Sequence, residues 1–242
     1  MSIKTVLKYS PNFNLKKRKT KEIKFLIFHY TGMKSEKAAI EKLTDIQSQV
    51  GANCFIKKNG EIINMVPDHY AAWHAGLSSW KKLKYLNKNS IGIEISNPGH
   101  QFGYKNFTKN QINSIKKLSL VLIKKYKIKK NNILGHSDIA PDRKKDPGER
   151  FPWQYLYKSR IGIWHNLDKK KLFKLRKKKL SSNESRSFMK SLKIIGYQSN
   201  NKFTKNKKKI LTFAFQRRFR PELVNGINDK ECLLIIQNLI KI

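Results

Sequence analysis

The chain has few cysteines, few acidic residues and no long apolar run. Only two of its 242 residues are cysteine, Cys54 and Cys232, and they form neither a CxxC pair nor a disulfide framework. Their apolar sequence neighbours indicate small buried thiols, a usage that fits a reducing compartment. No stretch is long enough to cross a bilayer, and residues 1–24 hold no apolar run of signal-peptide length. We therefore expect a protein without a membrane span that stays in the cytoplasm.

The scarcity of acidic residues leaves a large positive charge. Against 16 Asp and Glu stand 53 Lys and Arg, which gives a formal net charge of +37. Such an excess is typical of proteins with a polyanionic partner. Lys, Ile and Asn are abundant together, however, and an A/T-rich genome produces that composition by placing Lys at solvated positions. We favour this explanation and expect no nucleic-acid partner.

Strand and helix signals alternate over the first 160 residues. Residues 23–30, IKFLIFHY, are nearly all apolar and predict a buried strand. Residues 35–49 predict an amphipathic helix whose apolar positions recur at helical spacing: Ala39, Ile40, Leu43 and Ile46. Residues 54–66 predict a hairpin with Asn59-Gly60 at its tip.

The same alternation continues beyond the hairpin. Residues 90–96, SIGIEIS, place three isoleucines on one face of a strand and Glu94 on the other. Residues 108–127 predict a long helix that begins with a capping box of Thr108 and Gln111. Residues 131–136 form a short strand that ends at His136. The pattern predicts an α/β domain over residues 1–160.

The remainder of the chain changes character. Residues 168–180 are highly basic, and we interpret residues 161–182 as a linker or a solvated helix. Residues 183–242 carry helical signals and no strand signal. They predict a small all-α domain of three helices with an apolar core: Leu192, Ile195, Phe213, Phe215, Phe219 and the closing LLIIQNLI.

Polar side chains stand where predicted strands end. His29 and His136 each end a buried strand, and Asp146 follows ten residues after His136. Two imidazoles and one carboxylate can hold zinc and leave a fourth position open for water. Zinc would lower the pKa of that water to about 7 and polarise an amide carbonyl. Spacing alone does not separate Asp146 from Asp138 as the carboxylate, and a lone histidine at a strand end is more often structural.

Four segments together resemble the type 2 N-acetylmuramoyl-L-alanine amidases, the group that includes AmpD-like and AmiD-like enzymes and animal peptidoglycan recognition proteins. They occur in family order over residues 7–160: FHYTG at 28–32, AWHAG at 72–76, IGIEISNPG at 91–99 and GHSDIAPDRKKDPGERFPW at 135–153. The resemblance implies a mixed central β-sheet flanked by helices.

The resemblance also implies site residues at the matching positions. One Zn²⁺ per chain would be held by His29, His136 and Asp146, while Asp138 would support a ligand or order the loop. Glu94 would be the general base and Lys144 would stabilise the oxyanion.

Two further motif residues, Trp73 and His74, are predicted to line the substrate cleft, although a Trp there could equally belong to the core. The pair Asn53-Cys54 departs from the His-aromatic pair of many relatives. This departure leaves the cleft shape open. His69, His100 and His165 have no motif support and are interpreted as ordinary residues.

The tail is similar to the peptidoglycan-binding three-helix domain found behind some amidases. The similarity rests on SRSFMKSLKIIGY at 185–197, AFQRRFRP at 214–221 and NGINDKE at 225–231. The order of the two parts is that of AmiD-type amidases. Glycan binding by the tail is favoured over a helical appendage that only packs on the catalytic domain.

The resemblance implies hydrolysis of the amide between N-acetylmuramic acid and L-alanine, for cell-wall turnover or recycling. The partner would be peptidoglycan or a soluble (anhydro)muropeptide, and the chain a monomer. The tail favours intact wall and hence a periplasmic or envelope location, which competes with the cytoplasm. A non-catalytic peptidoglycan sensor and a nucleic-acid-binding protein are the alternative functions. The filled ligand positions and Glu94 argue against a sensor.

Overall fold

A six-stranded mixed sheet forms the centre of the first part of the chain. The structure is a computed structural model that describes residues 4–198 and 204–241. The strand order is β1-β5-β4-β9-β3-β10. In chain order these strands are β1 (Val6–Leu7), β3 (Phe25–Tyr30), β4 (Cys54–Ile56), β5 (Ile62–Asn64), β9 (Ser90–Ile95) and β10 (Ile133–Gly135). Two antiparallel pairs lie beside the sheet: β2 (Phe13–Asn14) with β6 (Ala71–Ala72), and β7 (Ser79–Trp80) with β8 (Leu83–Lys84).

The three strands that carry the polar candidates are parallel neighbours. β9 and β10 flank β3 in parallel, and the register places His29 opposite Glu94 and Phe28 opposite Gly135. Directly paired residues in a sheet project to the same face, and parallel strands end at the same edge. The strand ends therefore bring His29, Glu94 and His136 together.

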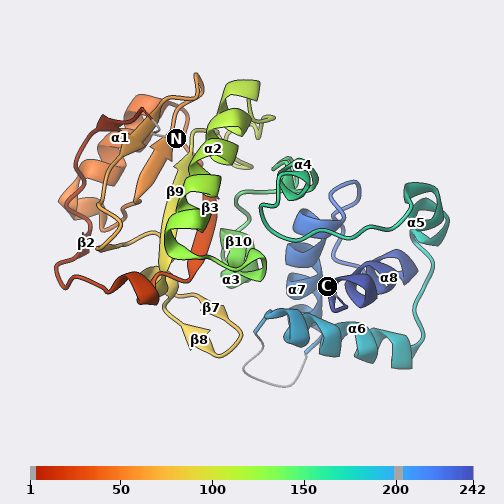
Figure 1. The fold of residues 1–242 in the computed structure, drawn as a ribbon. Coiled ribbons are helices and arrows are strands. Elements are labelled where there is room, and N and C mark those ends of the chain that lie inside the picture. Colours follow the sequence, from red (N-terminus) through yellow and green to blue (C-terminus); the bar gives the residue numbers. More distant parts are fainter. Residues whose placement is uncertain (1–3, 199–203, 242) are drawn as a thin grey trace.

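The sheet is covered on both faces by helices (Figure 1). The three isoleucines of β9 are fully buried in the core that also contains Ile115, Leu118 and Leu122 of α2 (Lys109–Tyr126). On the other face, Ala39, Ile40 and Leu43 of α1 (Glu36–Thr44) pack with Phe55, Ile63 and Met65. Glu94 alternates with the isoleucines and thus lies on the α1 side.

The element predictions are confirmed for β3, β9, β10 and α2. The capping box is present, because the Thr108 hydroxyl accepts from the Gln111 amide and the Gln111 side chain accepts from the Thr108 amide. The first helix is shorter than predicted. It ends at Thr44, and Ile46 in the following turn is 50% exposed, so its assignment to the apolar face was wrong.

The hairpin β4–β5 also forms, with a turn shifted by one residue. The amide of Gly60 donates to the Lys57 carbonyl, so Lys58 and Asn59 are the central turn residues. Gly60 follows with a φ of 88°, a conformation that favours glycine.

Helices follow the sheet. They are α3 (His136–Ile139), α4 (Trp153–Lys158), α5 (Lys169–Leu175), α6 (Ser182–Ile195), α7 (Lys205–Phe219) and α8 (Lys230–Leu239). Among them, α6, α7 and α8 fall in the predicted helical tail. Leu192, Phe215 and Phe219 are buried, whereas Ile195 and Phe213 are only partly buried. Residues 199–203 and 242 of the predicted tail domain lie outside the described residues, as do residues 1–3 of the N-terminal segment.

The segment predicted as a linker contributes to the core. Ile161, Ile163 and Trp164 are buried, and α5 packs against α8 through the buried Leu172. One hydrophobic cluster runs from the sheet through these residues into α6, α7 and α8. In Figure 1 the last three helices gather on the side of the sheet marked by β10 and α3. The division at residues 160 and 183 stays a prediction.

Both cysteines are buried and unpaired, as predicted. In the part of the chain that the structure describes, no helix combines the length and the apolar composition that a bilayer crossing requires.

Candidate active site

Three ligand-type atoms meet at the edge of the sheet where β3 and β10 end. His29 is the fifth residue of β3, His136 begins α3 directly after β10, and Asp146 lies in the loop that follows. The Nδ1 atoms of the two histidines are 2.9 Å apart, and Asp146 Oδ2 lies 3.1 Å from His29 Nδ1 and 3.0 Å from His136 Nδ1. All three side chains are buried.

A chain of hydrogen bonds decides which nitrogen of His29 carries the proton. The Ser90 hydroxyl donates to the Leu86 carbonyl at 2.6 Å, so it accepts from His74 Nε2 at 3.0 Å. Burial first, and His29 second, lower the pKa of His74 well below its ordinary value, so this imidazole is neutral. His74 Nδ1 must then accept from His29 Nε2, which lies 3.0 Å away. His29 Nδ1 is therefore left with a free lone pair.

In His136, a backbone carbonyl fixes the ring proton on Nε2, as His74 does in His29. Its Nε2 lies 3.2 Å from the Ala75 carbonyl oxygen, which can only accept, so Nε2 carries the proton. Arg143 Nη2 donates to that carbonyl at 2.5 Å and lies 3.5 Å from His136 Nε2. His136 Nδ1 thus also presents a lone pair.

The cluster fits a bound cation. Two imidazole lone pairs and one carboxylate oxygen face one another within 3.1 Å, an arrangement of three acceptors without a donor. Burial first, and the neighbouring His136 second, lower the pKa of His29 to about 4, which opposes relief by protonation. Acceptors held in this way could hold a metal ion.

Glu94 supplies a carboxylate beside the cluster. Its Oε1 lies 3.9 Å from His29 Nδ1, and its Oε2 is buried without a hydrogen-bond partner among the described residues. Burial first, and Asp146 second, raise the pKa of Glu94 to about 8. A carboxyl group with a pKa near neutrality, oriented at a ligand cluster, can take up and release a proton.

Positive charge comes from the loop between His136 and Asp146. Lys144 lines the cavity in front of the cluster, and its charge acts on both His29 and Glu94, lowering the pKa of each. Arg143 is fixed to the backbone by donating to the Ala75 and Leu77 carbonyls. Lys144 is thus the basic residue that this loop places in the cavity close to both groups.

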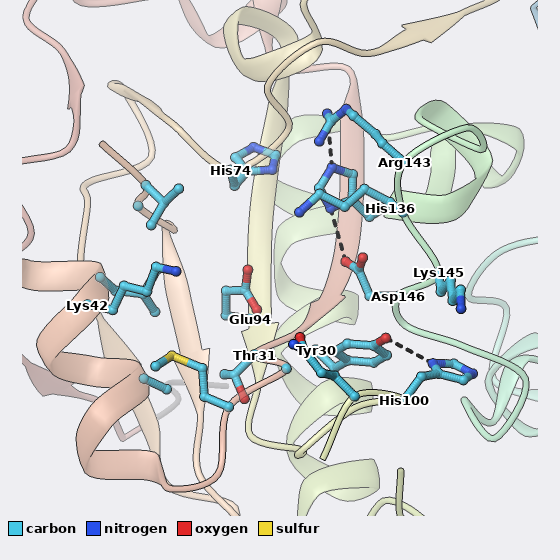
Figure 2. A pocket seen from close by; sticks show the side chains of 18 of the residues that line it. Tyr30, Thr31, Lys42, His74, Glu94, His100, His136, Arg143, Lys145 and Asp146 are labelled. Atoms are coloured by element: carbon cyan, nitrogen blue, oxygen red, sulfur yellow. Dashed lines mark hydrogen bonds and ion pairs between the residues drawn. The ribbon is translucent and has the colours of Figure 1, made fainter. Parts of the chain in front are cut away.

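The cavity has a volume of about 670 Å³ and joins residues from distant parts of the chain. Figure 2 shows Glu94, His136 and Asp146 directed into it, with Lys42 of α1 across the cavity. Trp73 forms part of the wall, and its indole nitrogen donates to Asn14 Oδ1 at 2.7 Å. His74 also reaches the wall, but both of its ring nitrogens are engaged by His29 and Ser90.

The sequence interpretation missed several cavity residues, and His100 is one of them. His100, considered ordinary, lines the cavity, and its Nδ1 lies 2.9 Å from the Tyr30 hydroxyl. Its Nε2 donates to the Glu149 carboxylate at 3.0 Å, because a carboxylate only accepts. Tyr30 directly follows His29, which suggests that it lies near the site. Nothing in the sequence, however, connects Tyr30 with His100.

Two other positions lie away from the cavity wall. Asn53 is buried and accepts from the Gly92 amide at 3.0 Å, so the Asn53-Cys54 departure tethers β4 to β9 instead of shaping the cavity. Asp138 points away from the ligand cluster, toward partners from the C-terminal helices. This leaves Asp146 as the carboxylate of the cluster.

A mixed sheet whose edge carries this cluster and an adjacent glutamate has the equipment of a metal-dependent hydrolase. The family model described as N-acetylmuramoyl-L-alanine amidase matches residues 19–149. The sequence is 34% identical over 231 residues to N-acetylmuramoyl-L-alanine amidase AmiD of Escherichia coli K12, covering 90% of this chain and 83% of that protein. It is also 34% identical over 163 residues to the 1,6-anhydro-N-acetylmuramyl-L-alanine amidase AmpD of Haemophilus influenzae, covering 60% of this chain and 86% of AmpD.

The fold agrees with the sequence matches. The structure of E. coli AmiD, solved with the substrate anhydro-N-acetylmuramic acid-L-Ala-D-γ-Glu-L-Lys, superposes with a TM-score of 0.80 at 33% identity and covers 91% of this chain and 89% of that chain. The chain therefore belongs to the N-acetylmuramoyl-L-alanine amidase family. The α/β fold and the amidase function predicted from the motifs are both confirmed.

Proposed function

We propose that this amidase works with one Zn²⁺ ion held by His29, His136 and Asp146. The observation that carries the proposal is the convergence of three buried acceptor atoms within 3.1 Å of one another. Two nitrogens and one oxygen are a ligand set that zinc accepts in hydrolases, with a fourth position left for water. Zinc bound there would lower the pKa of a water molecule and polarise the scissile carbonyl.

The side chains around the cluster supply proton transfer, oxyanion stabilisation and contacts with the substrate. Glu94 removes the proton from the attacking water and then delivers it to the departing L-alanine amine, for which its raised pKa is suited. Lys144 donates to the oxygen that becomes negative as the carbonyl is attacked. Trp73 offers its ring to the sugar of the substrate. His74 accepts the proton of His29 Nε2, which leaves the Nδ1 lone pair of His29 for the metal. It also lines the cavity, where it would contact the substrate.

The substrate is proposed to be peptidoglycan or a soluble (anhydro)muropeptide, cleaved between N-acetylmuramic acid and L-alanine. The relatives support the soluble anhydromuropeptide, since AmiD was solved with one and AmpD is named for the anhydro sugar, whereas intact peptidoglycan is proposed from the resemblance of the tail. The helical residues 183–242 are proposed to be a peptidoglycan-binding domain behind a catalytic domain of residues 1–160. The chain is proposed to act as a monomer in the cytoplasm, with the periplasm or envelope as the alternative location.

The test is a cleavage assay combined with metal analysis. The purified protein is expected to contain about one zinc per chain and to release L-Ala-peptide from both anhydromuropeptide and sacculi or from one of them. His136→Ala is expected to lose both zinc and cleavage, because one of three ligands is removed. Full zinc occupancy in that variant would contradict the ligand assignment.

The two competing functions predict other outcomes in the same preparation. A non-catalytic sensor would bind muropeptide and leave it intact. A nucleic-acid-binding protein would bind DNA with an affinity that falls steeply as salt is raised. Cleavage without salt-dependent DNA binding is the expected result.

A further inference from the structure

The carboxylate of Asp138, two residues after His136, is held by three donors. The Gly135 amide donates to Oδ2 at 2.8 Å, the Tyr197 hydroxyl to Oδ1 at 2.6 Å and Arg218 Nη1 to Oδ2 at 2.5 Å. Tyr197 follows α6 and Arg218 belongs to α7, so two of the three donors come from the C-terminal helices. Asp138 is only 1% exposed, and a buried carboxylate depends on such partners.

Tyr197 is fixed by tight packing. Its ring meets Trp80 edge-on with the ring centroids 5.0 Å apart. Gly196 has a φ of 142°, and a Cβ there would lie 2.4 Å from Trp80, so only glycine allows this approach. Burial first, and Asp138 second, raise the pKa of Tyr197 well above its ordinary value, which keeps the hydroxyl protonated as a donor.

Arg218 is fixed just as firmly. Its Nη2 donates to the Ile133 carbonyl of β10 at 2.8 Å. Its guanidinium lies 4.4 Å from the centroid of the Trp153 ring, and the side chain is 2% exposed. The charge therefore has one orientation, directed at Asp138.

The held carboxylate acts directly on the backbone that carries the ligands. Gly135, whose amide donates to Asp138, directly precedes His136. The helix that follows, α3, is a single turn of four residues and contains both His136 and Asp138. The amide of Ser137 donates to the Asp146 carbonyl at 2.7 Å, which links the backbones of both ligands. Groups that hold a ligand's support in place commonly tune metal affinity.

We propose that Tyr197 and Arg218 are positioning residues of the metal centre, which act through Asp138 on His136 and Asp146. The C-terminal helices are then a structural part of the active site, in addition to any role in glycan binding. This inference rests on the zinc site of the proposed function. It concerns geometry at the metal, so its test measures the metal directly.

The first experiment compares two Tyr→Phe substitutions that each remove one hydroxyl donated to an aspartate. Tyr197→Phe removes the bond to Asp138, whereas Tyr126→Phe removes a bond of 2.7 Å to Asp68, on a different part of the molecule. The readouts are the rate of zinc loss to a chelator and the visible spectrum of the Co²⁺-substituted protein. Tyr197→Phe is expected to speed zinc loss roughly tenfold and to shift the spectrum, in the range known for outer partners of metal ligands. Tyr126→Phe is expected to leave both unchanged.

The second experiment treats the arginine in the same way. Arg218→Gln removes the charge from Asp138, and Arg218→Lys returns a charge with a single donor group. The matched control is Arg176→Gln. It breaks a two-point ion pair with Glu231, in which both hydrogen bonds measure 2.8 Å and neither residue belongs to the proposed metal cluster. Arg218→Gln is expected to speed zinc loss roughly tenfold and Arg218→Lys to recover part of it. Arg176→Gln is expected to lower the melting temperature without changing the cobalt spectrum.

The outcomes separate the positioning role from general stability. Folded Tyr197→Phe and Arg218→Gln proteins with wild-type zinc loss and wild-type cobalt spectra would overturn the positioning role, even if both melt earlier. Should Arg218→Gln fail to fold, the tyrosine pair alone decides. A wild-type protein that binds no zinc would refute the metal centre of the proposed function, and the positioning role would fall with it.

Discussion

The protonation of individual side chains controls the chemistry of this site. His29 and His136 each donate one proton away from the cluster, to His74 and to the Ala75 carbonyl, and each turns a lone pair inward. His74 and the Ala75 carbonyl therefore orient the two proposed ligands without being ligands themselves. Glu94 has no such partner on Oε2, which leaves it free to exchange a proton.

The role of Glu94 is tested by an isosteric change. Glu94→Gln keeps the size of the side chain and removes its ability to take up a proton. We expect kcat to fall by about 10²- to 10⁴-fold, the usual contribution of a general base, while zinc content stays at the wild-type level. Cleavage assays and elemental analysis of the same preparation provide both values. Wild-type turnover in this variant would remove Glu94 from the mechanism.

The raised pKa of Glu94 predicts a pH effect on the metal-free chain. Burial raises the pKa from 4.5 to about 8, so over this window the folded state holds more protons than the unfolded state. Stability from this group is therefore lost as the pH rises through the window. Metal-free Glu94→Gln is expected to match the wild type at pH 4.5 and to be increasingly more stable toward pH 8. Denaturant unfolding of chelator-treated protein across this range measures the difference, and a constant difference would contradict the prediction.

Lys144 can be compared with its neighbour Lys145, because both line the cavity. Lys144→Gln is expected to lower kcat by about 10²- to 10³-fold, the effect of removing one donor to an oxyanion. Lys145→Gln is expected to change kcat less than about threefold, since no role in the reaction depends on it. Equal losses in the two variants would indicate a general charge effect on substrate binding.

At the scale of elements, parallel pairing of β3, β9 and β10 gathers the site. One face of β9 is filled by isoleucines, and the other carries Glu94 and the small residue Gly92. The space above Gly92 holds the ring of His74, and a Cβ at that position would lie 2.3 Å from His74 Cγ. A glycine in the middle of a strand therefore makes room for the partner of a ligand.

Gly92→Ala is expected to displace His74 and to weaken zinc binding about tenfold, with a stability loss of about 1–3 kcal/mol from overpacking. The double variant Gly92→Ala/His74→Ala relieves the clash but does not restore the hydrogen-bond partner of His29. We expect its melting temperature to recover while its zinc affinity stays low. Zinc titration and thermal unfolding of both variants check this, and normal zinc affinity in the single variant would show that His74 is dispensable.

At the scale of the whole molecule, the C-terminal helices and the sheet share one core. Trp153 lies under Arg218, Trp164 lies against Phe219, and Trp80 lies against Tyr197. Removal of the helices would expose these surfaces and leave Asp138 with one donor of three. AmpD of H. influenzae nevertheless matches only 60% of this chain over 86% of its own length.

A chain truncated to residues 1–182 is expected to be insoluble or to melt far below the full chain, because it exposes apolar surface and a poorly paired carboxylate. Soluble expression and thermal unfolding measure the effect. A truncated protein with the melting temperature and zinc content of the full chain would instead support the predicted independence of residues 1–160.

Part of the site could be predicted from local sequence, because His29 and His136 stand where strands end and Asp146 follows in the same motif as His136. His29 and His136 were named in this way, whereas the role of Glu94 and the choice of Asp146 over Asp138 came from family resemblance. His100 and the hydrogen bonds of His74 could not be predicted, since their partners lie far away in the chain. Ile46 was misplaced because helical spacing continued beyond the point where the helix ends.

What the sequence determined by itself is what periodicity and short motifs encode: the buried strands, the capped helix α2, the helical tail and the residues capable of holding a metal. The tertiary structure decided which atoms meet. Parallel pairing sets His29 beside Glu94, Ser90 and His74 assign the proton of His29, and the tail reaches back to Asp138. These contacts join residues 16 to 65 positions apart, and local preference carries no information about partners at such separations.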